Sequence, residues 1–139
     1  MARTTFNGPV ASQNGFISGH EVGTANAINA TATATAAQVA SGYITSTSAA
    51  GTTITLPTGT DLGTAIGATK GTVLDLYIDN TAGASTVTIA VNTNAILSTA
   101  AADTAGSFGD LTVAAGATGL ARYTLMFSSA TAYVFTRTA

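Results

Sequence analysis

The clearest structural signal in the chain is the run Thr72-Val73-Leu74-Asp75-Leu76-Tyr77-Ile78-Asp79-Asn80. Its leucine and isoleucine side chains, Leu74, Leu76 and Ile78, recur at every second position, and Asp75 and Asp79 occupy the other set of alternate positions. Because successive side chains of a β-strand point to opposite faces, this alternation predicts a strand. One face would pack in a core, and the two aspartates would face water or a partner.

Shorter runs of the same kind lie on both sides of this strand. They alternate apolar with polar residues, and turn-forming Gly, Asn, Ser and Pro separate them. The predicted strands are 43–45, 52–57, 72–80, 85–91, 111–113, 122–127 and 133–135. The side chains expected to point inward include Ile54, Leu56, Val87, Ile89, Val91, Tyr123, Leu125 and Phe127. About seven to eight short strands at near-regular spacing predict an all-β fold, a single β-sandwich or jelly-roll domain.

A short helix is predicted between the first segments. Residues 31–36 alternate Thr and Ala with the period of an extended segment, and about one helical turn follows over 36–41. Thr35 and Gln38 have the spacing of a capping box. Gly42 can adopt the left-handed conformation that ends a helix.

Two further segments are predicted to be turns. Asp61 is expected to cap a short helical turn that runs through Ile66. Residues 67–72 are rich in glycine but do not match a phosphate-binding loop, because Lys70 lies between Thr and Gly instead of following Gly and preceding Ser or Thr.

The first 24 residues differ in composition from the rest. Asn-Gly, Ser-Gly and Gly-Pro pairs recur every few positions and interrupt any long helix or strand. We therefore predict an extended N-terminal arm over 1–24 and a β-sandwich domain over 25–139. Candidate binding residues in the arm are Phe6 and Phe16, which can bury large areas, and Arg3, which can pair with a carboxylate. The arm could instead add an edge strand to its own sheet or to a neighbouring copy.

The composition excludes several classes of partner. The chain holds 29 Ala and 28 Thr but only four Lys or Arg and six Asp or Glu, for a net charge of −2. Binding to nucleic acid or to an anionic membrane surface needs clustered basic residues, and the four here are scattered. No apolar run reaches the roughly 18 residues of a membrane span. The opening residues lack the apolar region of a secretory signal, so we expect synthesis in a cytoplasm without export by the usual route.

Residues that carry out catalysis or hold metals are scarce. The chain has no cysteine, and its one histidine, His20, precedes Glu21 without the second histidine of a zinc-protease helix. Asp75 and Asp79 share a strand face, but their Cα atoms would lie about 13–14 Å apart. That separation exceeds the roughly 5–9.5 Å between glycosidase carboxylates. We expect no enzymatic activity, no small-molecule substrate, no cofactor and no metal site.

Four segments carry a family resemblance: Arg3 to Phe16, the Ala-Ala-Gln to Thr-Leu-Pro segment from Thr35 to Thr58, Leu76 to Asn80, and Val113 to Gly116. Together they resemble phage head decoration (cement) proteins and similar small jelly-roll virion proteins of tailed phages. The resemblance implies a jelly-roll-like sandwich, often a homotrimer, clamped onto the major capsid protein on the virion surface. It supplies no catalytic residues. On this basis we expect a capsid decoration protein that binds and stabilises the shell. The resemblance gives no capsid contacts by position, so Arg3, Phe6 and Phe16 are expected as contacts from the chemistry of the arm alone.

A second reading is a head-fibre, tail-fibre or adhesin-type binding module that contacts a host glycan. Such a site needs exposed aromatic side chains. The chain has four tyrosines, Tyr43, Tyr77, Tyr123 and Tyr133, which we expect to be half-buried. This expectation favours the decoration protein over the adhesin.

Overall fold

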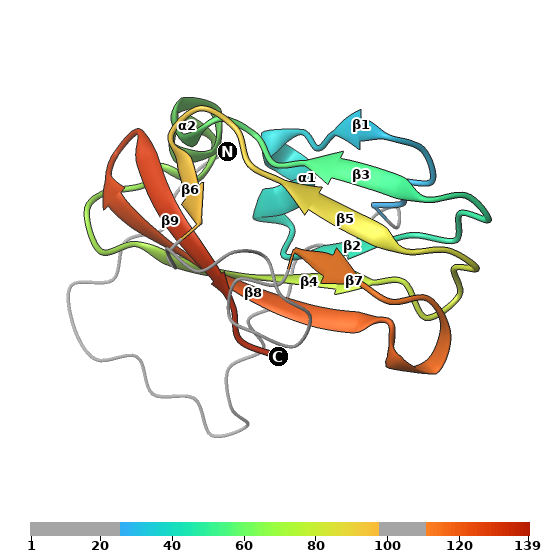
Figure 1. Cartoon of the computed structure of the whole chain (residues 1–139). Coiled ribbons are helices and arrows are strands. Elements are labelled where there is room, and N and C mark those ends of the chain that lie inside the picture. The colour runs from blue at the N-terminus through green and yellow to red at the C-terminus, as the bar shows by residue number, and fades with distance from the viewer. Residues whose placement is uncertain (1–25, 98–110) are drawn as a thin grey trace, which may run out of the picture.

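The computed structural model describes residues 26–97 and 111–139, which form a mainly β fold of two sheets with few helices (Figure 1). The predicted arm over 1–24 lies outside these residues. The four-stranded sheet has the order β1 (Ala32–Thr33), β3 (Thr52–Thr55), β5 (Val87–Ala90) and β7 (Thr112–Val113). The five-stranded sheet has the order β2 (Tyr43–Thr45), β4 (Val73–Asp79), β8 (Leu120–Ser129), β9 (Ala132–Arg137) and β6 (Ala95–Leu97).

The chain changes sheet at every strand from β1 to β8. Each of the first three strands pairs in parallel with the strand two places later. The chain from β1 to β5 therefore winds back and forth between the two sheets. The pairing of β6 with β9 is also parallel. The antiparallel pairs are β4 with β8, β8 with β9, and β5 with β7.

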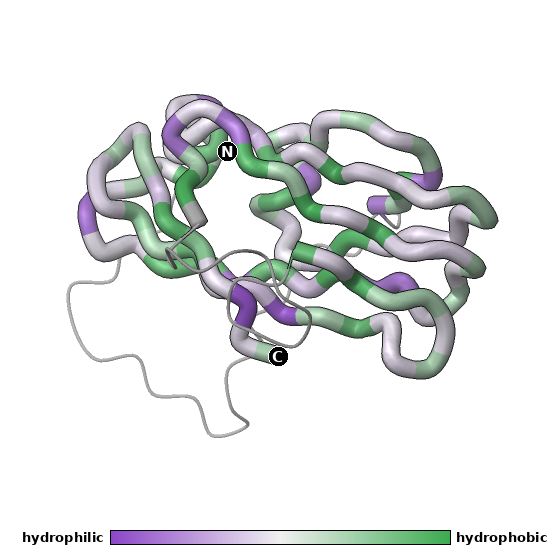
Figure 2. The backbone as a smooth tube through the Cα atoms, in the orientation of Figure 1, coloured by the Kyte–Doolittle hydropathy of each residue, from purple (hydrophilic) through white to green (hydrophobic). Residues whose placement is uncertain are grey.

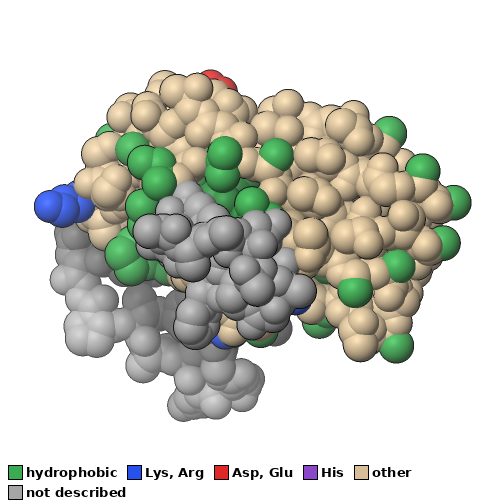
Figure 3. Space-filling view, viewed as in Figure 1, with side chains coloured by type: hydrophobic (Ala, Val, Ile, Leu, Met, Phe, Trp, Pro, Cys, Tyr) green, Lys and Arg blue, Asp and Glu red, His purple; other side chains and the backbone are tan. Residues whose placement is uncertain are grey.

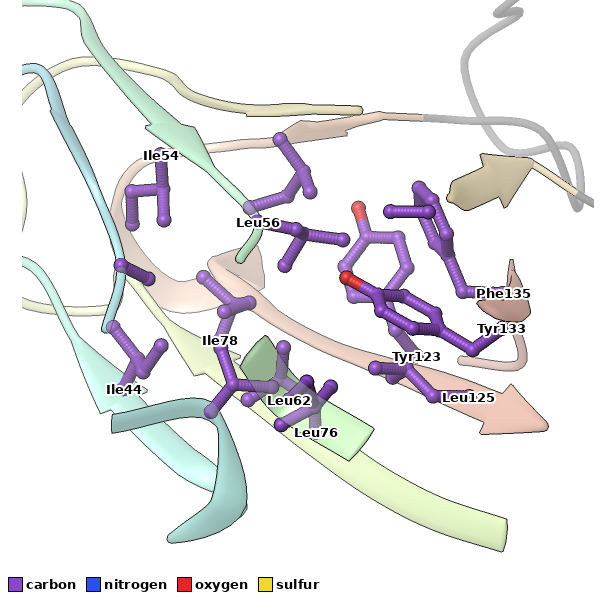
Figure 4. Packing of buried hydrophobic residues seen from close by; sticks show 14 of the residues in the cluster. Ile44, Ile54, Leu56, Leu62, Leu76, Ile78, Tyr123, Leu125, Tyr133 and Phe135 are labelled. Carbon is purple, nitrogen blue, oxygen red and sulfur yellow. The ribbon is translucent and has the colours of Figure 1, made fainter. Parts of the chain in front are cut away.

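Side chains from both sheets pack into one hydrophobic core (Figure 4). Ile54 and Leu56 reach it from the end of β3, and Leu76 and Ile78 reach it from β4, as the alternation predicts. Hydrophobic and polar positions alternate along the strands in Figure 2. The aromatic part of the core comes from β8 and β9: Tyr123, Phe127, Tyr133 and Phe135.

The capping box is confirmed. Helix α1 (Ala36–Ala40) begins after Thr35, whose hydroxyl accepts from the backbone N–H of Gln38 at 3.2 Å. The Gln38 side chain accepts from the backbone N–H of Thr35 at 2.8 Å. Gly42 has φ 75°, the left-handed conformation expected there.

The expected cap of the second helix was wrong. Helix α2 (Gly59–Ile66) is capped by Thr58, whose hydroxyl accepts from the N–H of Asp61 at 3.1 Å. Asp61 instead lies in the first turn, where its negative charge is favourable next to the exposed N–H groups of the helix. Gly63 lets α2 approach the β8–β9 turn closely, because a Cβ atom there would lie 1.9 Å from the carbonyl oxygen of Ala130.

Several other expectations differ from the structure. Strand β6 was not predicted, and the extended Thr/Ala segment contributes only β1, a strand of two residues. Val91 lies beyond the end of β5 and is exposed, although the alternation placed it in the core. A short 3-10 helix, η1 (Gly116–Thr118), takes the place of the predicted turn before β8. No helix among residues 26–97 and 111–139 is long and apolar enough to cross a membrane.

Candidate binding face of the five-stranded sheet

The side chains of the five-stranded sheet that point away from the core form one surface, which we call the outer face. Its members alternate with the buried residues of the same strands, so the period of two that builds the core also builds this face. The outer face includes Tyr43, Thr45, Val73, Asp75, Tyr77, Asp79, Ile96, Leu120, Arg122, Thr124, Met126, Val134 and Thr136.

One row of the outer face holds two tyrosines and an arginine. Tyr43 of β2 pairs with Tyr77 of β4, and Tyr77 pairs with Arg122 of β8. Tyr43 is 44% exposed and Tyr77 is 38% exposed, whereas Tyr123 and Tyr133 are fully buried. The expectation that all four tyrosines are half-buried was therefore wrong, because the strand alternation sends two outward and two inward.

The carboxylate of Asp79 is held in place by hydroxyl groups. The Tyr43 hydroxyl donates to one carboxylate oxygen. The other oxygen accepts from the Thr81 hydroxyl at 2.6 Å and from the Thr81 backbone N–H at 2.9 Å. The hydrogen bond from Thr81, followed by that from Tyr43, holds the pKa of Asp79 below its ordinary value. The same contact with Asp79, more than burial, raises the pKa of Tyr43.

The second aspartate of β4 has a different partner. Asp75 accepts from the Thr124 hydroxyl at 2.6 Å, across the β4–β8 pair. Asp75 and Asp79 thus lie on one face, as predicted, but each contacts a different strand and they do not converge. Arg122 donates from Nε to the Thr138 hydroxyl at 3.0 Å.

A second row of the outer face is apolar. Val73, Met126, Val134 and Ile96 are in direct register across β4, β8, β9 and β6. Val73 is 52% exposed, Met126 49% and Ile96 56%, and Val134 is half-buried. We call these four residues the apolar row. Hydrophobic side chains also gather at the β6 and β9 end of the molecule in the space-filling view (Figure 3).

The residues singled out in the arm lie outside the described residues; they are Arg3, Phe6, Phe16, His20 and Glu21. In the part of the chain that the structure describes, no group of three or more His, Cys, Asp or Glu side chains could hold a metal ion. Sequence reasoning missed both rows of the outer face. The signal was present in the outward positions of the predicted strands, but joining them needed the strand pairing.

Comparisons of the chain with protein families, with characterised proteins and with solved structures found no match.

Proposed function

We propose that the chain is a virion structural protein, a capsid decoration protein that binds the outer surface of the major capsid protein shell and stabilises it. The observation that carries this proposal is the apolar row. Four aliphatic or thioether side chains lie in register across four strands, and three of them are about half exposed or more. Protein interfaces concentrate such groups, methionine included, and keep charged residues away from their centre.

The shortage of charge supports the same function. Ten of the 139 residues are charged, and the visible face in Figure 3 carries few charged side chains. A protein that binds a repeated protein surface can use shape and apolar contact in place of steering by charge. The sequence resemblance to decoration proteins, stated above, points to the same class of partner.

The proposal includes a β-sandwich whose two sheets enclose the shared core. A jelly roll is built from antiparallel strands. Four of the seven strand pairs within the described residues are parallel. The proposed function therefore does not rest on the expected jelly roll.

The proposal also assigns a docking role to residues 1–24, with Arg3, Phe6 and Phe16 as contacts to the shell, and a homotrimer on the virion. A trimer fits a local threefold axis of a capsid, where three copies meet equivalent surfaces. Ordering an arm costs roughly 1–2 kcal/mol per fixed backbone residue, so the arm must gain more than this from its partner.

Co-sedimentation with capsids that lack the protein tests the proposal. We expect the full chain to sediment with the capsids, and a Met126→Asp/Ile96→Asp double variant to stay in the supernatant with its melting temperature unchanged. A chain without residues 2–20 should behave in the same way. Thr88→Asp, on the four-stranded sheet, is the matched control and should still bind. Absence of the protein from purified virions, or full binding by the double variant, would contradict the proposed function.

A further inference from the structure

The tyrosine row of the outer face lies apart from the apolar row and has a different chemistry. Along β4 the two rows are separated by Asp75, which lies two positions from Val73 and two from Tyr77. The tyrosine row consists of Tyr43, Tyr77 and Arg122, which supply two exposed phenol rings and a guanidinium. The carboxylate of Asp79, already bound by hydroxyl groups, lies beside the row, two positions from Tyr77 along β4. This combination of groups is better suited to bind a polar ligand with apolar faces than to bind an apolar protein surface.

We infer that Tyr43, Tyr77, Asp79 and Arg122 form a binding site for a neutral hexopyranose unit of a polysaccharide. The inference goes beyond the proposed function, since capsid binding needs only the apolar row and the arm. A pyranose ring has an apolar C–H face and a rim of hydroxyls. The exposed rings of Tyr43 and Tyr77 match the first feature, and the carboxylate and guanidinium match the second.

Asp79 retains capacity to bind a ligand. An ionised carboxylate has about four lone-pair sites. Three of its bonds are accounted for by the Tyr43 hydroxyl and by the hydroxyl and N–H of Thr81. The Tyr43 hydroxyl donates its hydrogen to Asp79, so the Tyr43 oxygen can still accept a hydrogen bond from a sugar hydroxyl.

The internal hydrogen bonds also prepare the site. Tyr43 is tied to Asp79 and Asp79 to Thr81, so two of the contacting side chains are oriented before the ligand arrives. Fewer rotamers are then lost on binding, which favours affinity at an exposed site. The rings themselves stand on adjacent paired strands, and strands hold side chains more firmly than loops do.

The charges of the face select a neutral sugar. Asp75 and Asp79 lie two positions to either side of Tyr77 on the same strand face, and Arg122 is the one basic group in the row. Two carboxylates against one guanidinium disfavour an anionic sugar such as a uronic acid. A proline-rich peptide, which also docks on aromatic side chains, uses an aromatic-lined groove and has no hydroxyls to offer Asp79.

The test is a titration of the isotope-labelled full chain with maltohexaose, cellohexaose, laminarihexaose and mannohexaose, followed by NMR. Polygalacturonate and an oligoproline peptide are run beside them. We expect at least one neutral oligosaccharide, at concentrations up to about 10 mM, to shift the Tyr43, Tyr77 and Arg122 resonances. Tyr77→Ala should weaken that binding by about tenfold, equivalent to about 1.4 kcal/mol.

Matched variants separate ring contact from hydroxyl contact. Tyr43→Phe keeps the ring and should weaken binding less than Tyr43→Ala. Met126→Ala changes a side chain of similar exposure in the apolar row and should leave saccharide binding unchanged, although it lies on the surface proposed for the capsid. All three substituted residues are exposed, and an unchanged melting temperature verifies the fold of each of the four variants. The inference is overturned if no neutral oligosaccharide binds, if polygalacturonate or the peptide alone binds, or if Tyr77→Ala binds as the parent does.

Discussion

The hydroxyl of Tyr133 donates a 2.8 Å hydrogen bond to the backbone carbonyl of Pro57, 76 positions earlier in the chain. Tyr133 lies near the start of β9 in the five-stranded sheet, and Pro57 follows β3 of the four-stranded sheet. The bond therefore ties the two sheets together within the core. Burial raises the pKa of Tyr133, because the phenolate would lose its hydration, so the group stays a neutral donor.

Replacing Tyr133 with Phe should destabilise the protein by about 1–3 kcal/mol. The ring is kept, but the carbonyl of Pro57 is left buried without this partner. Chemical denaturation of the variant and the parent measures the difference. Tyr77→Phe is the control, since its hydroxyl lies on the exposed outer face, and it should change stability by less than about 0.5 kcal/mol. Equal losses for both variants would contradict the assigned role of the Tyr133 hydroxyl.

Asn80 is a second fixed point of the fold, and Asn80→Asp should be among its most damaging single changes. The side-chain amide of Asn80 is fully buried and donates to the carbonyls of Ser85, Val113 and Ala114, at 2.9 Å, 3.3 Å and 2.9 Å. An aspartate would place a carboxyl oxygen, which accepts hydrogen bonds and is charged when ionised, where the amide now donates to these three carbonyl oxygens. We expect a loss of about 3–5 kcal/mol, measured by thermal and chemical denaturation.

The matched control for that change is Asn29→Asp. Asn29 is exposed, and its side-chain oxygen accepts from the backbone N–H of Thr47 at 2.8 Å, a role that an aspartate can also fill. The control should leave the free energy of unfolding within about 0.5 kcal/mol of the parent. A mild effect of Asn80→Asp would show that the three carbonyls have other donors.

The two faces of β5 give a third prediction. Ile89 points into the core and Thr88 points away from it, as the sequence alternation predicts. Ile89→Asp buries an unpaired carboxylate and should cost more than about 4 kcal/mol, which can abolish folding. Thr88→Asp should leave the melting temperature close to that of the parent. Circular dichroism of both variants measures this, and equal stability of Ile89→Asp and the parent would contradict the assigned faces.

The Tyr43–Asp79 contact should make a small contribution to stability that depends on pH. The pKa of Asp79 is lowered in the fold, so its contribution is present above the ordinary value of 3.8 and is lost as the pH falls through the folded pKa. The pKa of Tyr43 is raised, so its contribution is present below the ordinary value of 10.0 and is lost as the pH rises through the folded pKa.

Urea denaturation of Asp79→Asn and of the parent, from below pH 3.8 to above pH 10.0, tests the contact. We expect the difference between them to be largest in the middle of the range and to shrink at both ends. NMR of labelled tyrosine should show the pKa of Tyr43 falling toward its ordinary value in the variant. A pKa of Tyr43 that does not respond to the substitution would contradict the assigned cause.

Local patterns in the sequence predicted much of the fold. The alternation of residues 72–80 identified the buried Leu76 and Ile78 and the exposed Asp75. The spacing of Thr35 and Gln38 located α1, because a capping box involves only residues three apart. These signals succeed because the groups that satisfy one another are neighbours in the chain.

Features that depend on distant partners were not predictable in this way. Tyr43 and Tyr77 lie together because β2 and β4 pair in parallel, and no local pattern states which strands pair or in which register. Strand β6 is three residues long and paired along one side with β9, so its own sequence carries little strand signal. Thr58 and Asp61 both suit a helix start, and the structure rather than composition distinguishes the cap from the first turn.

The winding of β1 to β5 between the two sheets has a consequence for the rate of folding. No two consecutive strands among these five pair with each other, so each pairing must wait until a loop through the opposite sheet has closed. Domains dominated by such distant pairings fold in about milliseconds to seconds, whereas helical bundles of similar size fold much faster. During that interval the partly folded chain exposes strand edges that have not yet paired with their partner strands. Refolding yield should therefore fall as the concentration of the chain rises, because those edges can pair between molecules.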